Sequence, residues 1–223
     1  MVPIAYRNLT PQRFAWLKGA LFVLATLPFI RLVVAAFTDQ LGANPVEFIT
    51  RNTGDWTLYL LCAALAVTPL RKLTGLVWLA RLRRMVGLFG FFYATLHFTT
   101  FLWFDHAFDL AEMWRDVVKR PFITVGFSAF VLLIPLALTS TNAMVKRLGS
   151  KRWQWLHRLV YLILPLGVLH FWWMKAAKHN LVQPFAFAVL VGALLAVRVL
   201  WKIRQKSVST NAANSLPSPV QSR

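Results

Sequence analysis

The sequence contains a succession of apolar runs, each close to the length that a helix needs to cross a lipid bilayer. A hydrocarbon core of about 30 Å requires roughly 20 apolar residues in helical conformation. Six runs approach that length, and they cover residues 19–37, 56–70, 85–104, 122–139, 155–174 and 181–201. This pattern predicts an all-α protein, an integral membrane bundle of six transmembrane helices in contact with membrane lipid.

The overall composition agrees with a membrane protein and excludes several other classes. The chain is 58% hydrophobic and 14% charged, whereas soluble domains are about 45–50% apolar and about 25% charged. The single cysteine, Cys62, excludes internal disulfides and a CxxCH site for covalent heme. The sequence also contains none of the glycine-rich nucleotide-binding, HExxH or GxSxG motifs. A soluble nucleotide-binding enzyme, a zinc protease or a serine hydrolase is therefore not expected.

The charged residues are divided between the two sides of the predicted bundle. Of the 25 Lys and Arg residues, 18 fall before the first run, between the second and third, around the connection of the fourth to the fifth, or at the end of the sixth and beyond it. Six fall in the opposite loops, together with all seven Asp and Glu residues. By the positive-inside rule, both termini are expected in the cytoplasm. Because the bases flank separate spans instead of forming one soluble face, the net charge of +18 does not indicate nucleic-acid binding.

These features divide the chain into three expected parts. Residues 1–18 form a cytoplasmic N-terminal segment and residues 19–206 the six-helix domain. Residues 207–223 form a disordered cytoplasmic tail rich in Ser, Asn and Pro. The first run is long for the apolar region of a signal peptide and five more runs follow it, so we expect an uncleaved helix.

Three histidines lie within or at the edge of the predicted spans, where an ionisable residue is costly and is therefore a functional candidate. At 1.5 Å per residue, His97 lies about 18 Å and His170 about 22 Å from the inner side of the membrane. Two neutral imidazoles at one level on two helices suit the two axial positions of a b-type heme. The alternative is two unrelated histidines that hydrogen-bond to neighbouring backbone carbonyls. His106 and His179 fall in outer loops, where solvated side chains are expected.

Two further residues are candidates for contact with a cofactor. His157 lies only about 3 Å inside the inner face. It is expected to be either a ligand of an inner cofactor or an ordinary interfacial histidine. The third run offers Arg83 and Arg84 at that level, so no second histidine is evident for an inner heme. Arg31 lies about 18 Å deep, level with His97, where heme propionates would offset the cost of burying a guanidinium. Snorkelling of Arg31 to the outer interface is the alternative.

Two stretches of the chain resemble the ferric-reductase-like transmembrane domain, whose superfamily contains ferric reductases and NADPH oxidases. One is LGSKRWQWLHRLVY, residues 148–161, with His170 thirteen residues after His157. The other is RRMVGL, residues 83–88, followed by YATLHF, residues 93–98. With six predicted helices and no attached flavin domain, residues from about 10 to 205 are similar to the heme-binding membrane subunits of bacterial periplasmic methionine sulfoxide reductase systems.

The resemblance implies a cytochrome of the bacterial inner (plasma) membrane that carries electrons and leaves the catalysis to another subunit. The histidines of the family fall on His97, His157 and His170, as axial ligands of iron in one or two hemes b; FMN and a quinone are further implied. Electrons would enter from the quinone pool or a cytosolic flavin reductase. They would leave to a periplasmic molybdopterin catalytic subunit that reduces methionine sulfoxide in oxidised proteins. Two alternatives remain open: an independent ferric- or superoxide-type reductase, and a non-redox transporter with intramembrane His and Arg residues.

Overall fold

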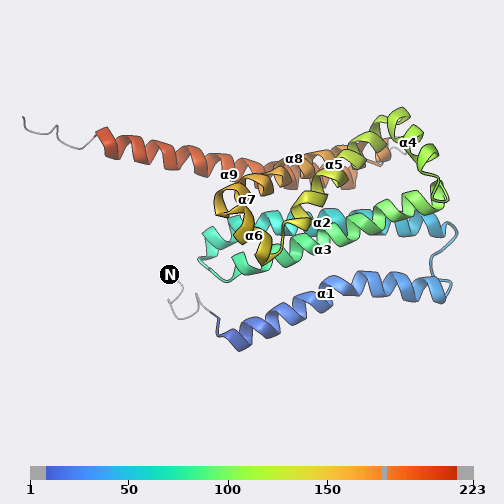
Figure 1. Ribbon diagram of the computed structural model, residues 1–223, viewed down its shortest axis with the longest axis horizontal. Helices are drawn as coiled ribbons and strands as arrows, with labels where there is room; N and C mark the ends of the chain where they lie inside the picture. Colours follow the sequence, from blue (N-terminus) through green and yellow to red (C-terminus); the bar gives the residue numbers. More distant parts are fainter. Residues whose placement is uncertain (1–8, 177–179, 215–223) are drawn as a thin grey trace, which may run out of the picture.

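The computed structural model describes residues 9–176 and 180–214 as a bundle of helices (Figure 1). The long helices are α1 (Pro11–Phe37), α2 (Pro45–Thr74), α3 (Leu79–Thr100), α5 (Pro121–Leu138), α8 (Val160–Ala176) and α9 (Val182–Asn214). The short helices are α4 (Leu110–Lys119), α6 (Asn142–Leu148) and α7 (Ser150–Leu156), with a π-helical turn at Phe101–Asp105 and a 3₁₀ turn at His157–Leu159. No β-strand occurs within the described residues. The all-α prediction is confirmed for this part of the chain.

Five helical segments of the described chain are long and apolar enough to cross a membrane. They are Pro11–Phe37, Leu79–Asp105, Pro121–Leu138, Ser150–Ala176 and Val182–Gln205. They coincide with five of the predicted spans, and the protein is a multi-pass membrane protein. The remaining predicted span, residues 56–70, lies inside α2 and is not among the five. Its apolar stretch is short because Asp55 precedes it and Arg71 and Lys72 follow it, so the sixth span stays a prediction.

Helix α2 lies inside the bundle, where it packs against α3, α8 and α9. It contributes more buried residues than α1, α3, α5 or α8. Leu58, Leu61 and Leu65 of α2 join the main core cluster, which also holds Leu133 of α5 and Leu164 of α8. A helix covered by other helices has little surface facing lipid and does not need to be apolar all round. The position of α2 therefore explains how it carries polar side chains into the bundle.

Helix α1 runs along the edge of the bundle (Figure 1) and is tied to α3 by a buried tyrosine. Pro28 interrupts the hydrogen bonding of α1 because proline has no backbone N–H. The hydroxyl of Tyr93 accepts a hydrogen bond from the Phe29 N–H (3.0 Å) and donates one to the Ala25 carbonyl (2.8 Å). In an uninterrupted helix that N–H and that carbonyl would bond to each other. The tyrosine therefore fills a break in α1 and fixes α1 against α3.

After α3 the chain turns sharply before it enters α4. The π-helical turn is followed by Ala107 and Phe108, whose φ angles of 45° and 65° lie in the left-handed region. The carboxylate of Asp109 then caps α4 by accepting hydrogen bonds from the backbone N–H groups of Glu112 and Ala111. These bonds stabilise the ionised carboxylate and hold the pKa of Asp109 below its usual value. The turn places α4 against the start of the next long helix, α5.

The prediction of a solvated loop histidine at position 106 is wrong. The side chain of His106 is buried, and its ring packs edge-on against Phe101 with the centroids 4.6 Å apart. Its Nε2 lies 3.5 Å from a carboxylate oxygen of Asp116 on α4. The two left-handed residues after His106 fold α4 back over it, which the hydropathy pattern does not indicate. His179, the other expected loop histidine, lies outside the described residues.

The two ends of the bundle differ in what they carry. The start of α1, the helices α6 and α7 and the C-terminal end of α9 lie at one end, whereas α4 lies at the other (Figure 1). The first end holds the connections that are rich in Lys and Arg. Helix α9 continues to Asn214, so residues 207–214 are helical where composition predicts disorder; residues 215–223 lie outside the described chain. That the base-rich end is cytoplasmic stays a prediction.

Candidate functional site

A cavity of about 530 Å³ lies between the α2–α3 pair and the α5–α8 pair. This volume is within the range of about 300–1,000 Å³ that is usual for cofactor and small-molecule sites. The walls are mostly apolar and include Leu58, Leu61, Phe98, Phe130, Leu133 and Ile163. The cavity therefore suits a largely apolar group that lies between the two pairs of helices.

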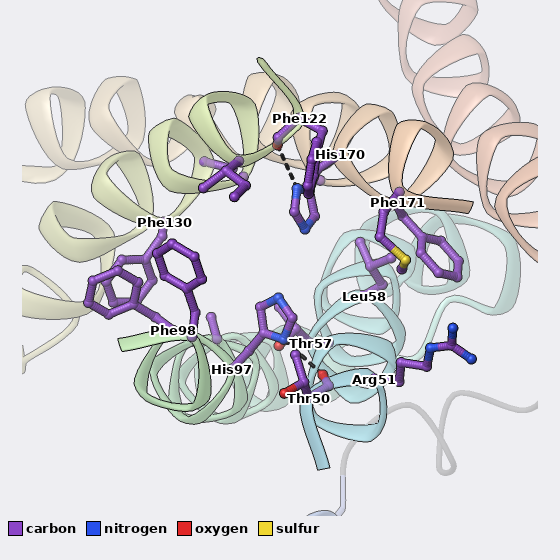
Figure 2. A pocket seen from close by; sticks show the side chains of 18 of the residues that line it. Thr50, Arg51, Thr57, Leu58, His97, Phe98, Phe122, Phe130, His170 and Phe171 are labelled. Atoms are coloured by element: carbon purple, nitrogen blue, oxygen red, sulfur yellow. Dashed lines mark hydrogen bonds between the residues drawn. The ribbon is translucent and has the colours of Figure 1, made fainter. Parts of the chain in front are cut away.

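The structure brings the two deep histidines together across this cavity. His97 comes from α3 and His170 from α8, and both line the cavity. Figure 2 shows the two rings pointing toward one another from opposite walls. The ring centroids are 6.1 Å apart and the ring planes are inclined by 77°. The equal depth estimated from the sequence thus corresponds to a facing pair.

Each of these imidazoles is fixed by a hydrogen bond from Nδ1 to a backbone carbonyl. The Nδ1 of His97 lies 2.9 Å from the carbonyl oxygen of Thr50, and the Nδ1 of His170 lies 2.7 Å from that of Phe122 (Figure 2). Because a carbonyl only accepts, Nδ1 must carry the proton in both rings. In the neutral ring Nε2 then holds a free lone pair. This is the arrangement in which a backbone partner orients a histidine that binds a metal.

Two glycines give the imidazoles the space that they occupy. A Cβ at Gly126 of α5 would lie 2.6 Å from Nδ1 and 2.9 Å from Cγ of His170. A Cβ at Gly54 of α2 would lie 3.1 Å from Cε1 and 3.2 Å from Nδ1 of His97. The histidine rings therefore lie directly against the backbone of the neighbouring helix, and any larger residue would push them toward the cavity.

The pair fits the two axial positions of a heme iron. Imidazole nitrogens bind a metal at about 2.0–2.1 Å, so two coaxial imidazoles on one ion have their ring centroids about 6 Å apart. No group of three or more His, Cys, Asp or Glu side chains that could hold a metal ion occurs in the described part of the chain. An iron held here by two histidines would therefore take its remaining ligands from a macrocycle, for which the apolar cavity has room.

The polar lining residues of the cavity lie at the end of the bundle that carries α4. The acids are Glu47 and Asp55 in the first half of α2 and Asp105 at the end of the π-helical turn, and the cations are Arg51, Arg120 and Lys175. We refer to Arg51, Arg120 and Lys175 as the rim cations. Sequence reasoning missed them because it ranked residues by depth in the membrane, which does not tell which way a side chain points.

Arg31, the residue expected to meet heme propionates, does not line this cavity. It is exposed on α1. The structure therefore does not bring it together with His97 and His170, and its contact with a cofactor stays a prediction.

His157 lies apart from the cavity, in the 3₁₀ turn between α7 and α8. Its Nδ1 lies 3.0 Å from the Trp153 carbonyl, and its ring stacks on the Trp153 ring with the centroids 3.9 Å apart. Its Nε2 is buried without a hydrogen bond of good geometry among the described residues, although the Leu136 carbonyl is in range. The charged groups that act on it are Arg83 and Arg84, as the third apolar run suggested. The structure therefore gives His157 a buried Nε2 near the Leu136 carbonyl but does not pair it with another described histidine.

Comparison with known proteins places this architecture in a family. Residues 53–168 match the family described as ferric reductase like transmembrane component; that range holds His97 and His157 and ends just before His170.

Three relatives are each named protein-methionine-sulfoxide reductase heme-binding subunit MsrQ. The one from Herminiimonas arsenicoxydans is 66% identical over 206 residues, which cover 92% of this chain and 94% of the relative. Those from Ralstonia nicotianae and Bordetella pertussis are 56% and 52% identical, over 94% and 87% of this chain and 96% and 92% of their own. The chain therefore belongs to the MsrQ family, within the ferric-reductase-like transmembrane proteins.

Proposed function

We propose that this protein is a b-type cytochrome subunit that carries electrons across the bacterial inner membrane to a periplasmic methionine sulfoxide reductase. The observation that carries the proposal is the facing pair His97 and His170, with both Nε2 lone pairs free in an apolar cavity. The names of the relatives, which describe heme-binding subunits of protein-methionine-sulfoxide reductase, support the same assignment. The subunit would thereby support the repair of oxidised periplasmic proteins.

In this proposal His97 and His170 would hold the iron of heme b through their Nε2 atoms. The bound heme supplies one-electron oxidation and reduction. The backbone carbonyls of Thr50 and Phe122 hold the two rings in one tautomer, so neither ring needs to turn or to exchange a proton when the iron changes charge. The mostly apolar walls would favour binding of the apolar part of the porphyrin.

His157 is proposed as the contact of a second, inner cofactor. The cavity lies toward the α4 end, so a single heme would leave the other half of the membrane without a carrier. A buried imidazole nitrogen that faces a carbonyl acceptor without a hydrogen bond of good geometry is a group that a ligand would satisfy. A second heme, FMN or a bound quinone would each serve, and Arg83 and Arg84 would favour an anionic group there.

The direction of electron flow follows from the proposed topology. We infer six spans, with α2 as the sixth, both termini in the cytoplasm, and a division of the chain into residues 1–18, 19–206 and 207–223. Electrons from the quinone pool or a cytosolic flavin reductase would then enter at the base-rich end. They would leave from the cavity end to a molybdopterin catalytic subunit of the MsrP (YedY) type. The chain itself would transfer electrons and would make no bond in the substrate.

The first test is an absorption spectrum of the purified full-length protein in detergent. We expect a Soret band that shifts on reduction. The reduced protein should also show a sharp band near the wavelength typical of six-coordinate b-type heme. A protein without a Soret band would be the non-redox transporter and would overturn the proposal.

The second test measures the acceptor. The reduced protein in proteoliposomes should be reoxidised by methionine sulfoxide only when the periplasmic molybdopterin subunit is present. Rapid reoxidation by ferric chelates or oxygen alone, with no effect of that subunit, would indicate the independent reductase.

A further inference from the structure

We propose that Lys175 binds a propionate carboxylate of the heme. It would thereby set the orientation of the porphyrin, with the propionate edge at the end of the cavity that holds the rim cations. This inference rests on the proposed heme function and goes beyond it, because it assigns an anchoring cation and an orientation. Lys175 lies on α8, five residues after His170, and lines the cavity beside Phe171.

Lys175 is a buried cation without a close carboxylate in the described part of the chain. Its residue is only 9% exposed, and its ammonium lies 5.7 Å from the centroid of the Phe171 ring. The other two rim cations differ from it, since Arg51 forms an ion pair with Glu47 and Arg120 forms one with Asp116. No described carboxylate lies within 4.0 Å of Lys175. A buried charge without a close partner is costly in free energy. An anion from outside the described chain would therefore stabilise this ammonium.

Asp55 is the carboxylate that comes nearest to meeting this need. It attracts Lys175 electrostatically, but it also attracts Arg51 and hydrogen-bonds to Gln183. Its charge is therefore shared among several partners. Glu47 and Asp105 also line the polar end of the cavity, so an incoming anion must compete with acids for the rim cations.

The shape of the cavity determines which part of a heme would reach Lys175. Heme b carries its two carboxylates on one edge of the porphyrin. With the iron between His97 and His170, the opposite end of the cavity is formed by apolar side chains such as Leu61, Leu133 and Ile163. Carboxylates buried there would lose their hydration without a partner. The only favourable orientation directs them to the end that holds Lys175, with Arg51 and Arg120 beside it.

The test compares heme with heme dimethyl ester, in which both carboxylates are neutral esters. Heme-free full-length protein in detergent is titrated with each compound, and the ratio of the two dissociation constants is measured. We expect the wild-type protein to prefer the free acid by about ten- to a hundredfold, the usual worth of a hydrogen bond to a charged group. Lys175→Met should bring this ratio close to one, whereas Lys175→Arg should retain most of it. Lys119→Met, which removes an exposed lysine of α4 that does not line the cavity, is the matched control and should leave the ratio unchanged.

The variant Asp55→Asn distinguishes a purely structural role of Lys175 from the proposed binding of a propionate. If Lys175 mainly pairs with Asp55, Asp55→Asn and Lys175→Met should lower the melting temperature alike and leave the ratio at the wild-type value, which would overturn the proposal. If Lys175 binds a propionate, Asp55→Asn should raise affinity for the free acid, because a competing carboxylate is gone.

The ester test remains decisive even if Lys175→Met fails to fold. A wild-type protein that binds both compounds equally would overturn the role of Lys175 while leaving the heme in place. A wild-type protein that binds neither would instead overturn the proposed function.

Discussion

The histidines at the two ends of the bundle share the same local hydrogen bond but differ in what surrounds them. His97, His170 and His157 each bind a backbone carbonyl through Nδ1, so in all three neutral rings the lone pair is on Nε2. At the α4 end two such rings face each other across a cavity, with a glycine behind each ring. At the other end the single ring is stacked on Trp153. The tautomer alone therefore does not make a heme site; the space opposite Nε2 and a second imidazole do.

The largest effect is expected from removing either member of the facing pair. His97→Ala and His170→Ala should each lose nearly all of the heme proposed for the cavity, which we call the outer heme. The loss of one imidazole would leave one position of the iron without a ligand. The measurement is the reduced-minus-oxidised spectrum and the ratio of heme to protein after purification. Imidazole added to the buffer should restore part of the band if the cavity is otherwise intact. A full heme spectrum in both variants would contradict the pairing.

The next largest effect is expected from the glycine behind His170. In Gly126→Ala the added methyl would lie 2.6 Å from Nδ1, a distance that real Cβ atoms essentially never show, so the ring or the helix must move. The ring cannot move freely because Nδ1 is bonded to the Phe122 carbonyl. If an overpacking cost of about 1–3 kcal/mol falls on the heme-bound state, heme affinity decreases by about five- to 150-fold.

The matched control for Gly126→Ala is Gly192→Ala, where the new methyl meets nothing within 4 Å. Heme content should be unchanged in this control. Equal heme content in both variants would show that His170 does not depend on the close approach of α5.

A smaller effect is expected behind His97. The methyl of Gly54→Ala would lie 3.1 Å from Cε1, which a shift of a few tenths of an ångström relieves. We therefore expect a loss of heme affinity of about two- to threefold, and a small change in the ferric low-spin EPR signal as the ring turns. Gly87→Ala on α3 is the control, since open space surrounds it. A larger loss of heme affinity in Gly54→Ala than in Gly126→Ala would contradict the expectation that the closer contact, at Gly126, matters more.

The sequence predicted the pair but not its surroundings. Helical rise along an apolar run gives depth, and depth was sufficient to put His97 and His170 on one level. Direction around the helix axis depends on how helices pack, so depth alone does not indicate that Lys175 lines the cavity whereas Arg31 does not. Gly54 and Gly126 are ordinary glycines in sequence, and only the packed structure gives them a ring as neighbour.

Two parts of the fold lie beyond what the local pattern indicates. Apolar length alone does not settle how α2 lies, because Asp55 precedes its short apolar stretch and Arg71 and Lys72 follow it. The expected solvation of His106 is wrong because two left-handed residues fold α4 back over it. At His106, tertiary contacts override the local pattern.

The smallest effect on the outer heme is expected at the other end of the bundle. His157 lies outside the cavity and contacts Trp153, so His157→Ala should leave the outer heme band and its midpoint potential unchanged. Any second component in a redox titration, from an inner heme or flavin, should disappear, since the free Nε2 is the group proposed to hold it. Trp153→Phe keeps the stacked ring and serves as the control for local packing. Loss of all heme in His157→Ala would mean that His157 pairs with His97 in the functional protein, and the contrast between the two ends would then be wrong.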